Sequence, residues 1–131
     1  MAQPGRSVPA PAFISFDAAR TRDLLAFDRL IPALKRMFAT GCRVPTRHTH
    51  TVESEPGKAG TVLIMPAWSS DGYLGVKTVC IYPGNAALGL PGLHATYMLH
   101  VARTRVPLAQ IGGTELTSRR VLTLSYVDGY K

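Results

Sequence analysis

With 131 residues, 46% of them hydrophobic and 18% charged, the chain is long enough for one domain with its own core and too apolar to be intrinsically disordered. No apolar stretch is long enough to span a bilayer and the first residues hold no secretory signal, so we expect a cytoplasmic protein without a membrane partner. The net charge of +7 invites a nucleic-acid interpretation, but the basic residues are scattered and no RNP-like strand, zinc-finger spacing or basic helix accompanies them, so we expect no nucleic-acid partner and rank such a binder last.

The first third of the sequence predicts a short strand and two helices. Residues 1–12 are typical of a flexible leader, and 13–16 favour a strand that ends at Asp17, a residue type that caps helices. A short helix over 18–25 follows, and then a longer one with Asp28 as its N-cap and Gly41 at its C-terminal end. Apolar residues recur in the longer helix at helical spacing, which predicts a core-facing stripe: Leu30, Ile31, Leu34, Met37 and Phe38.

From Arg43 onward the hydrophobic pattern changes to a period of two, as strands require. The pattern predicts strands over 44–52, 61–65, 73–82, 93–100 and 107–111, with a hairpin loop over 53–60 and turns at 82–85 and 89–92. Gly112 and Gly113 end the last strand, after which Thr114 or Thr117 can cap a helix. These elements predict an α+β fold with the N-terminal helices packed on a mixed or antiparallel sheet.

Three cations stand in places that suggest anion binding. Arg47 and Lys77 each lie inside an alternating pattern, where a charge that points inward is costly unless it is paired. Lys77 shares its face with small and apolar neighbours, although an outward lysine on an edge strand explains it equally well. Arg120 follows another arginine at a helix start, where a guanidinium suits carboxylates or phosphates and where a solvated pair is also common.

The thiols and histidines predict no metal site. Cys42 and Cys80 are far apart and lack a CxxC or Cys/His framework, so we expect two buried or idle thiols rather than a disulfide. His48 and His50 form an H-x-H on one strand face, but no third ligand stands at a plausible spacing. Polar strand residues are the preferred interpretation.

Between about Phe13 and Arg120 the chain resembles the ornithine cyclodeaminase/mu-crystallin family. The order and spacing of six short motifs carry the resemblance: VPTRH (44–48), MPA (65–67), GVK (75–77), YPGN (82–85), HAT (94–96) and TELTSRR (114–120). VPTRHTHTV and YPGN-x4-LPGLHATY look closest to bacterial ornithine cyclodeaminases and Δ1-pyrroline-2-carboxylate reductases.

The resemblance implies a substrate-binding and dimerisation domain over 13–120, which a Rossmann domain would follow. Arg47 and Lys77 would hold the carboxylate of an amino acid or cyclic imino acid, and Met65 would line the pocket. Arg120 would contact both substrate and cofactor, and Thr96 would lie near the dinucleotide, which is NAD or NADP in the family. A carboxylate fixed by cations presents one Cα face for hydride transfer.

Departures from the family pattern lie near the C-terminal end. Relatives usually carry an acid near Val101, a glycine at Arg105 and an acid near Gly112, and an arginine in a left-handed turn costs about 1–2 kcal/mol. After Arg120 the tail over 121–131 is β-branched and alternating, and no glycine-rich dinucleotide loop follows. The sequence therefore predicts a truncated member, from a frameshift or early stop, that is inactive alone and binds no nicotinamide tightly.

Three functions stay open. The intact family converts ornithine to proline with NAD and loss of ammonia, so the first is a fragment of an ornithine cyclodeaminase. The second is a fragment of an NAD(P)H-dependent Δ1-pyrroline-2-carboxylate (ketimine) reductase. The third is a non-catalytic module that pairs with itself, or with a full-length relative, through an exposed sheet edge.

Overall fold

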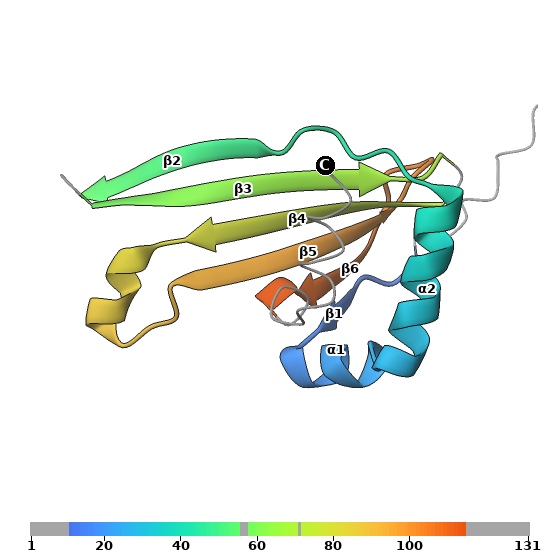
Figure 1. Ribbon diagram of the computed structural model, residues 1–131, viewed down its shortest axis with the longest axis horizontal. Coiled ribbons are helices and arrows are strands. Elements are labelled where there is room, and N and C mark those ends of the chain that lie inside the picture. The colour runs from blue at the N-terminus through green and yellow to red at the C-terminus, as the bar shows by residue number, and fades with distance from the viewer. Residues whose placement is uncertain (1–10, 56–57, 71, 115–131) are drawn as a thin grey trace, which may run out of the picture.

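Six strands form a single mixed sheet in the computed structural model, which describes residues 11–55, 58–70 and 72–114. The strand order is β1-β6-β5-β4-β3-β2 (Figure 1). β1 runs parallel to β6, and the other neighbouring strands are antiparallel. The predicted α+β class is confirmed. The strands are β1 (Ile14–Phe16), β2 (His48–Glu55), β3 (Lys58–Trp68), β4 (Tyr73–Ile81), β5 (Leu93–Val101) and β6 (Pro107–Gly112).

Two α-helices connect β1 to β2. α1 (Ala18–Leu24) begins at Asp17, whose carboxylate oxygen Oδ1 accepts a hydrogen bond of 2.8 Å from the backbone N–H of Arg20. The predicted Asp17 cap is therefore confirmed. α2 (Phe27–Thr40) has Ala26 as its N-cap, so the prediction of Asp28 is wrong. Asp28 lies in the first turn instead, where a carboxylate interacts favourably with the helix dipole.

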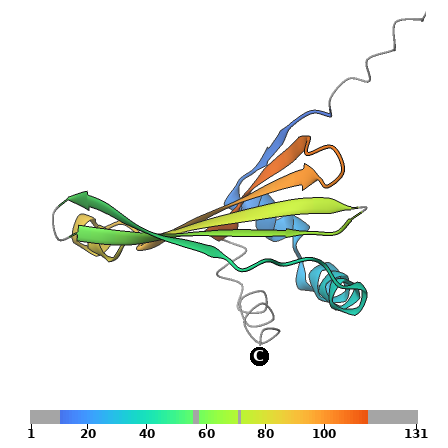
Figure 2. The same cartoon turned by 90° about the horizontal axis from the view of Figure 1, so that it is seen from above.

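The apolar stripe of α2 does not face a core in this structure, contrary to the prediction. None of the helix residues is buried, and Met37 and Phe38 are among the exposed large hydrophobic side chains. Figures 1 and 2 show α2 beside one end of the sheet rather than across a face. The pattern fixed which side of the helix is apolar, but it could not fix what covers that side. Within the described ranges, no helix has the length and apolarity to cross a membrane.

The strands differ in length from the prediction. β2 and β3 continue through most of the predicted hairpin loop, because Glu53 pairs with Ala59, and Glu55 pairs with Lys58 after a bulge. Gly60 lies within β3, and a side chain would not fit there, because a Cβ at this position would lie 2.8 Å from the carbonyl oxygen of Ile81. At its other end β2 is shorter than predicted and begins only at His48.

The β4–β5 connection and the β5–β6 turn each contain one residue with a positive φ. η1 (Pro83–Leu88) is a 3-10 helix between β4 and β5, and it ends at Gly89, which has a left-handed backbone with φ of 69°. The Asn85 side-chain amide donates a hydrogen bond of 2.9 Å to the Pro91 carbonyl across this turn. In the β5–β6 turn Arg105 has φ of 64°, the one positive φ at a non-glycine residue of the described chain.

Thr114 is the last described residue, and the backbone N–H groups that it was predicted to cap lie beyond it, outside the described residues. Its hydroxyl accepts a hydrogen bond of 3.2 Å from the backbone N–H of Ala95 and so ties the chain after β6 back to β5. Of the predicted leader only residues 11 and 12 are described. Thr117, Arg120 and the predicted tail over 121–131 lie outside the described residues.

Candidate functional site

Lys77 lies on β4, which is an interior strand with β3 on one side and β5 on the other. It pairs with Met65 on β3 and with Tyr97 on β5. Residues that pair directly in an antiparallel ladder point to the same face, so these three side chains share one face of the sheet. That face is the core face, because the buried cluster contains Met65, Val79 and Ala95. The alternative of an outward lysine on an edge strand is therefore wrong.

Arg47 comes immediately before β2 rather than inside it. Its side chain is exposed, and extending the register by one residue from the His48–Ile64 pair brings it beside Met65 on the Lys77 face. The electrostatics agree with this placement. Burial lowers the pKa of the Lys77 ammonium group, and the positive charge of Arg47 lowers that pKa further.

The two cations have no acidic partner among the described residues; the ion pair between Lys58 and Glu55 lies at the far hairpin. The charge of the exposed Arg47 repels that of the half-buried Lys77, and an anion near both relieves the repulsion and offsets the lost hydration of Lys77. Arg47, Lys77 and the apolar Met65 thus make up a candidate site for a small anion with an apolar body. We call these three residues the cation site.

A tyrosine that the sequence interpretation did not select borders the cation site. The phenol of Tyr97 leans from β5 over Gly75 on β4, and a Cβ built on Gly75 would overlap its hydroxyl oxygen and lie 3.2 Å from its ring carbon Cε1. Gly75 lies in the interior of β4 and is buried. A glycine inside a strand signals the close approach of another group. That signal was available in the sequence, but not the identity of the group.

The predicted cofactor contacts are not brought to the cation site. Thr96 pairs with Thr78, the residue after Lys77, so its exposed side chain lies on the opposite face of the sheet. Arg120 lies outside the described residues. The sequence has no Gly-x-Gly-x-x-Gly after a strand, the loop that holds the pyrophosphate of a dinucleotide in Rossmann domains. The described residues therefore do not fit a dinucleotide.

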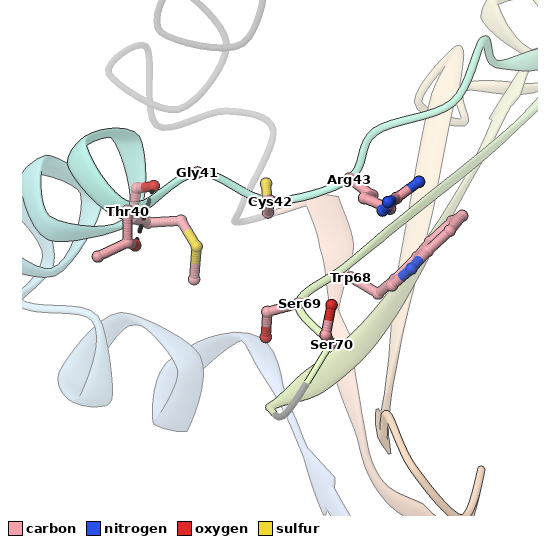
Figure 3. Close-up of a pocket in the computed structure, with 8 residues that line it drawn as sticks. Thr40, Gly41, Cys42, Arg43, Trp68, Ser69 and Ser70 are labelled. Atoms are coloured by element: carbon pink, nitrogen blue, oxygen red, sulfur yellow. Dashed lines mark hydrogen bonds between the residues drawn. The ribbon is translucent and has the colours of Figure 1, made fainter.

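A hollow with a volume of about 610 Å³ lies elsewhere on the described surface. Figure 3 shows that Thr40, Gly41 and Cys42, at the end of α2, line one side of it, and that Trp68 and Ser69, from the end of β3, line the other. Arg43 joins the two sides through backbone hydrogen bonds of 2.8 and 3.0 Å with Trp68. Of the predicted site residues that the structure describes, none lines this hollow.

The histidines and thiols do not gather into a metal centre in the part of the chain that the structure describes, where no three His, Cys, Asp or Glu side chains could share an ion. His48 and His50 lie exposed on β2. Cys42 and Cys80 are both free and exposed. The expectation of unpaired thiols is confirmed, whereas buried thiols are not observed.

Several known proteins are similar to this chain in sequence and in fold. A Δ1-pyrroline-2-carboxylate reductase from Colwellia psychrerythraea is 31% identical over 110 residues, which are 82% of this chain and 34% of that protein. The solved Thermococcus litoralis Δ1-pyrroline-2-carboxylate reductase, in complex with NADH and L-proline, matches with a TM-score of 0.64 and 29% identity over 82% of this chain and 33% of that one. An archaeal alanine dehydrogenase dimer with bound NAD matches with a TM-score of 0.63 and 29% identity, covering 84% and 33%.

The fold is thus one that occurs in NAD(H)-bound reductases and dehydrogenases. The profile of the ornithine cyclodeaminase/mu-crystallin family matches residues 17–128, and the chain belongs to that family. It spans between a quarter and about a third of the length of the curated relatives that it matches.

Proposed function

We propose that this chain is the carboxylate-binding part of an NAD(P)-dependent amino-acid or imino-acid oxidoreductase, and that alone it binds such carboxylates without transforming them. The observation that carries the proposal is Lys77 on the core face with the exposed Arg47 near it, both without an acidic partner in the described chain. Its geometry suits a ligand whose carboxylate lies between the cations and whose apolar body contacts Met65. Dinucleotide binding is assigned to the remaining two thirds of the longer relatives.

The chemistry of the family gives this site a defined task. When bound, a nicotinamide supplies or accepts the hydride. The residues of this chain fix the carboxylate and so orient the carbon beside it, which lowers the entropic cost of reaching the reactive geometry. The Lys77 ammonium group contributes only while it is protonated, so its lowered pKa limits binding on the alkaline side.

A binding experiment tests the proposal. L-Proline and the planar analogue pyrrole-2-carboxylate are titrated into the purified chain and into Lys77→Met and Arg47→Gln variants, with binding followed by NMR. A hydrogen bond to a charged group contributes about 1.5–3 kcal/mol, so each substitution should weaken binding about 10- to 100-fold. Lys58→Met is the matched control, because it removes an exposed lysine far from the site.

Two results would contradict the proposal. Equal affinity of the wild type and the Lys77→Met variant for these carboxylates would show that the cation site does not bind them. Tight NADH binding by the chain alone would overturn the assignment of the dinucleotide to other parts of the longer proteins. Affinity should also fall as the pH rises through the lowered pKa of Lys77, and the Lys77→Met variant should lose that dependence.

A self-association module is the second candidate, and the β2 edge favours it. All eight residues of β2 are exposed, and β2 lies at the end of the strand order, so its outer backbone groups are available for pairing. Sedimentation of the chain separates the candidates. A strict monomer that binds proline-like acids contradicts the module, whereas a stable dimer that binds none of them supports it.

A further inference from the structure

A shallow gap in the sheet surface lies next to the cation site. Ala67 on β3 pairs with Gly75 on β4, and this pair directly follows the Met65–Lys77 pair on the same face. A glycine beside an alanine leaves a gap in a layer of side chains. The Tyr97 phenol lies over Gly75 and so extends into this gap. The wall of the cation site on this side is therefore aromatic, and its position depends on the missing Cβ of Gly75.

The charges around the site exclude one class of ligand. Lys77 and Arg47 are both cationic, and no carboxylate of the described residues is paired with either of them. A diamino acid such as ornithine would bring a second ammonium group at the end of a flexible chain. That group would be repelled by two like charges, and the Tyr97 ring occupies the space over Gly75 that an extended chain would need. A compact cyclic imino acid carries its apolar ring close to the carboxylate and needs no such room.

We propose that Tyr97, whose phenol occupies the space left by the missing side chain of Gly75, is a specificity-determining residue. It restricts the site to compact imino-acid carboxylates and excludes extended diamino acids. This inference rests on the proposed function and selects between its two substrate classes. Tyr97 acts by filling space beside the carboxylate, and Gly75 acts only by leaving room for the phenol. The effects of substitutions at the two positions on ligand preference should therefore be non-additive.

The test is a competition between L-proline and L-ornithine for the chain and its variants, with both dissociation constants measured by NMR titration. The wild type should prefer proline by at least about tenfold, the lower end of what pocket shape achieves. Tyr97→Ala opens the gap and should reduce the preference about fivefold or more, chiefly by improving ornithine binding. Gly75→Ala should reduce it similarly, because its methyl group displaces the phenol.

A double substitution supplies the internal control. In the Tyr97→Ala background, Gly75→Ala has no phenol to displace and should change the preference by less than about twofold. Tyr97→Phe keeps the ring and should retain most of the preference, which separates filled space from the hydroxyl group. Circular dichroism and thermal melts check that each variant is folded, and Tyr97→Ala carries the test alone where Gly75→Ala does not fold.

The outcomes distinguish this inference from the proposed function. If the wild type binds neither ligand, both are overturned. If proline binding depends on Lys77 but the Tyr97→Ala variant keeps the wild-type preference, only the role of Tyr97 is overturned. A full effect of Gly75→Ala in the Tyr97→Ala background would also overturn it, because the glycine would then act independently of the tyrosine.

Discussion

Arg105 occupies a backbone conformation that L-residues with a side chain disfavour. Its φ is 64°, and two hydrogen bonds hold the turn: the Arg105 N–H donates to the Val101 carbonyl at 2.8 Å, and the Val101 N–H donates to the Val106 carbonyl at 3.0 Å. The left-handed conformation costs a non-glycine residue about 1–2 kcal/mol, because its Cβ crowds the following carbonyl. We therefore expect Arg105→Gly to stabilise the chain.

The magnitude follows from comparison with a second arginine in the same turn. Replacing an arginine by glycine also loosens the unfolded chain, which costs about 0.4–1 kcal/mol at any position. Arg103 is exposed and does not have a positive φ, so Arg103→Gly shows this loss alone and removes the same charge. The difference between the two variants should then be about 1–2 kcal/mol in favour of Arg105→Gly.

Urea denaturation gives the free energies of unfolding, and thermal melts give an independent ranking. About 1 kcal/mol shifts the midpoint of a domain of this size by about 3–6 °C, so the two glycine variants should differ by about 3–12 °C. Arg105→Ala keeps the Cβ and removes the guanidinium, so it should bring little of the gain. Equal stability of the two glycine variants, or a gain from Arg105→Ala as large as from Arg105→Gly, would refute the strain argument.

Two further predictions concern the cap and the buried cation. Asp17→Ala removes the cap of α1 and should lower the free energy of unfolding by about 1 kcal/mol in urea titrations, whereas Asp28→Ala, which removes only a first-turn charge, should cost about half of that. Between the lowered pKa of Lys77 and its ordinary value of 10.5 the unfolded chain binds more protons than the folded chain, so wild-type stability should rise with pH over this interval. The Lys77→Met variant should be more stable at neutral pH and lack this rise, and parallel pH profiles of the two proteins would contradict the lowered pKa.

Much of the fold follows from local patterns. The β-branched alternation around Val79 and the turn residues around Gly89 are sufficient to place β4, β5 and the turns between them, because strand and turn preferences agree with the final structure there. Asp17 was predictable as a cap for the same reason. Lys77 was recognisable as a candidate because its neighbours in the alternating pattern are apolar.

The sequence did not show which segments of the chain lie against each other in the fold. Tyr97 was recognised as part of the site only from the β4–β5 register, which places it opposite Lys77 and depends on the geometry of the long connection between these strands. The stripe of α2 was assigned to a core because amphipathicity requires a cover for an apolar face, yet it does not say which segment provides that cover. Asp28 was misplaced because acidic residues are favoured both at the N-cap and in the first turn.

The ladder between β3 and β4 also decides which insertions the chain can accept. Met65 and Lys77 share a face only in the observed register, and the connection between Trp68 and Tyr73, closed by a hydrogen bond of 3.2 Å from the Ser69 N–H to the Tyr73 carbonyl, lies between them. A slip of one residue would turn the lysine to the opposite face and leave the methionine where it is. The β2–β3 hairpin end lies beyond a bulge and far from the lysine. Length changes during the divergence of such chains should therefore accumulate at that hairpin and be rare in the β3–β4 connection.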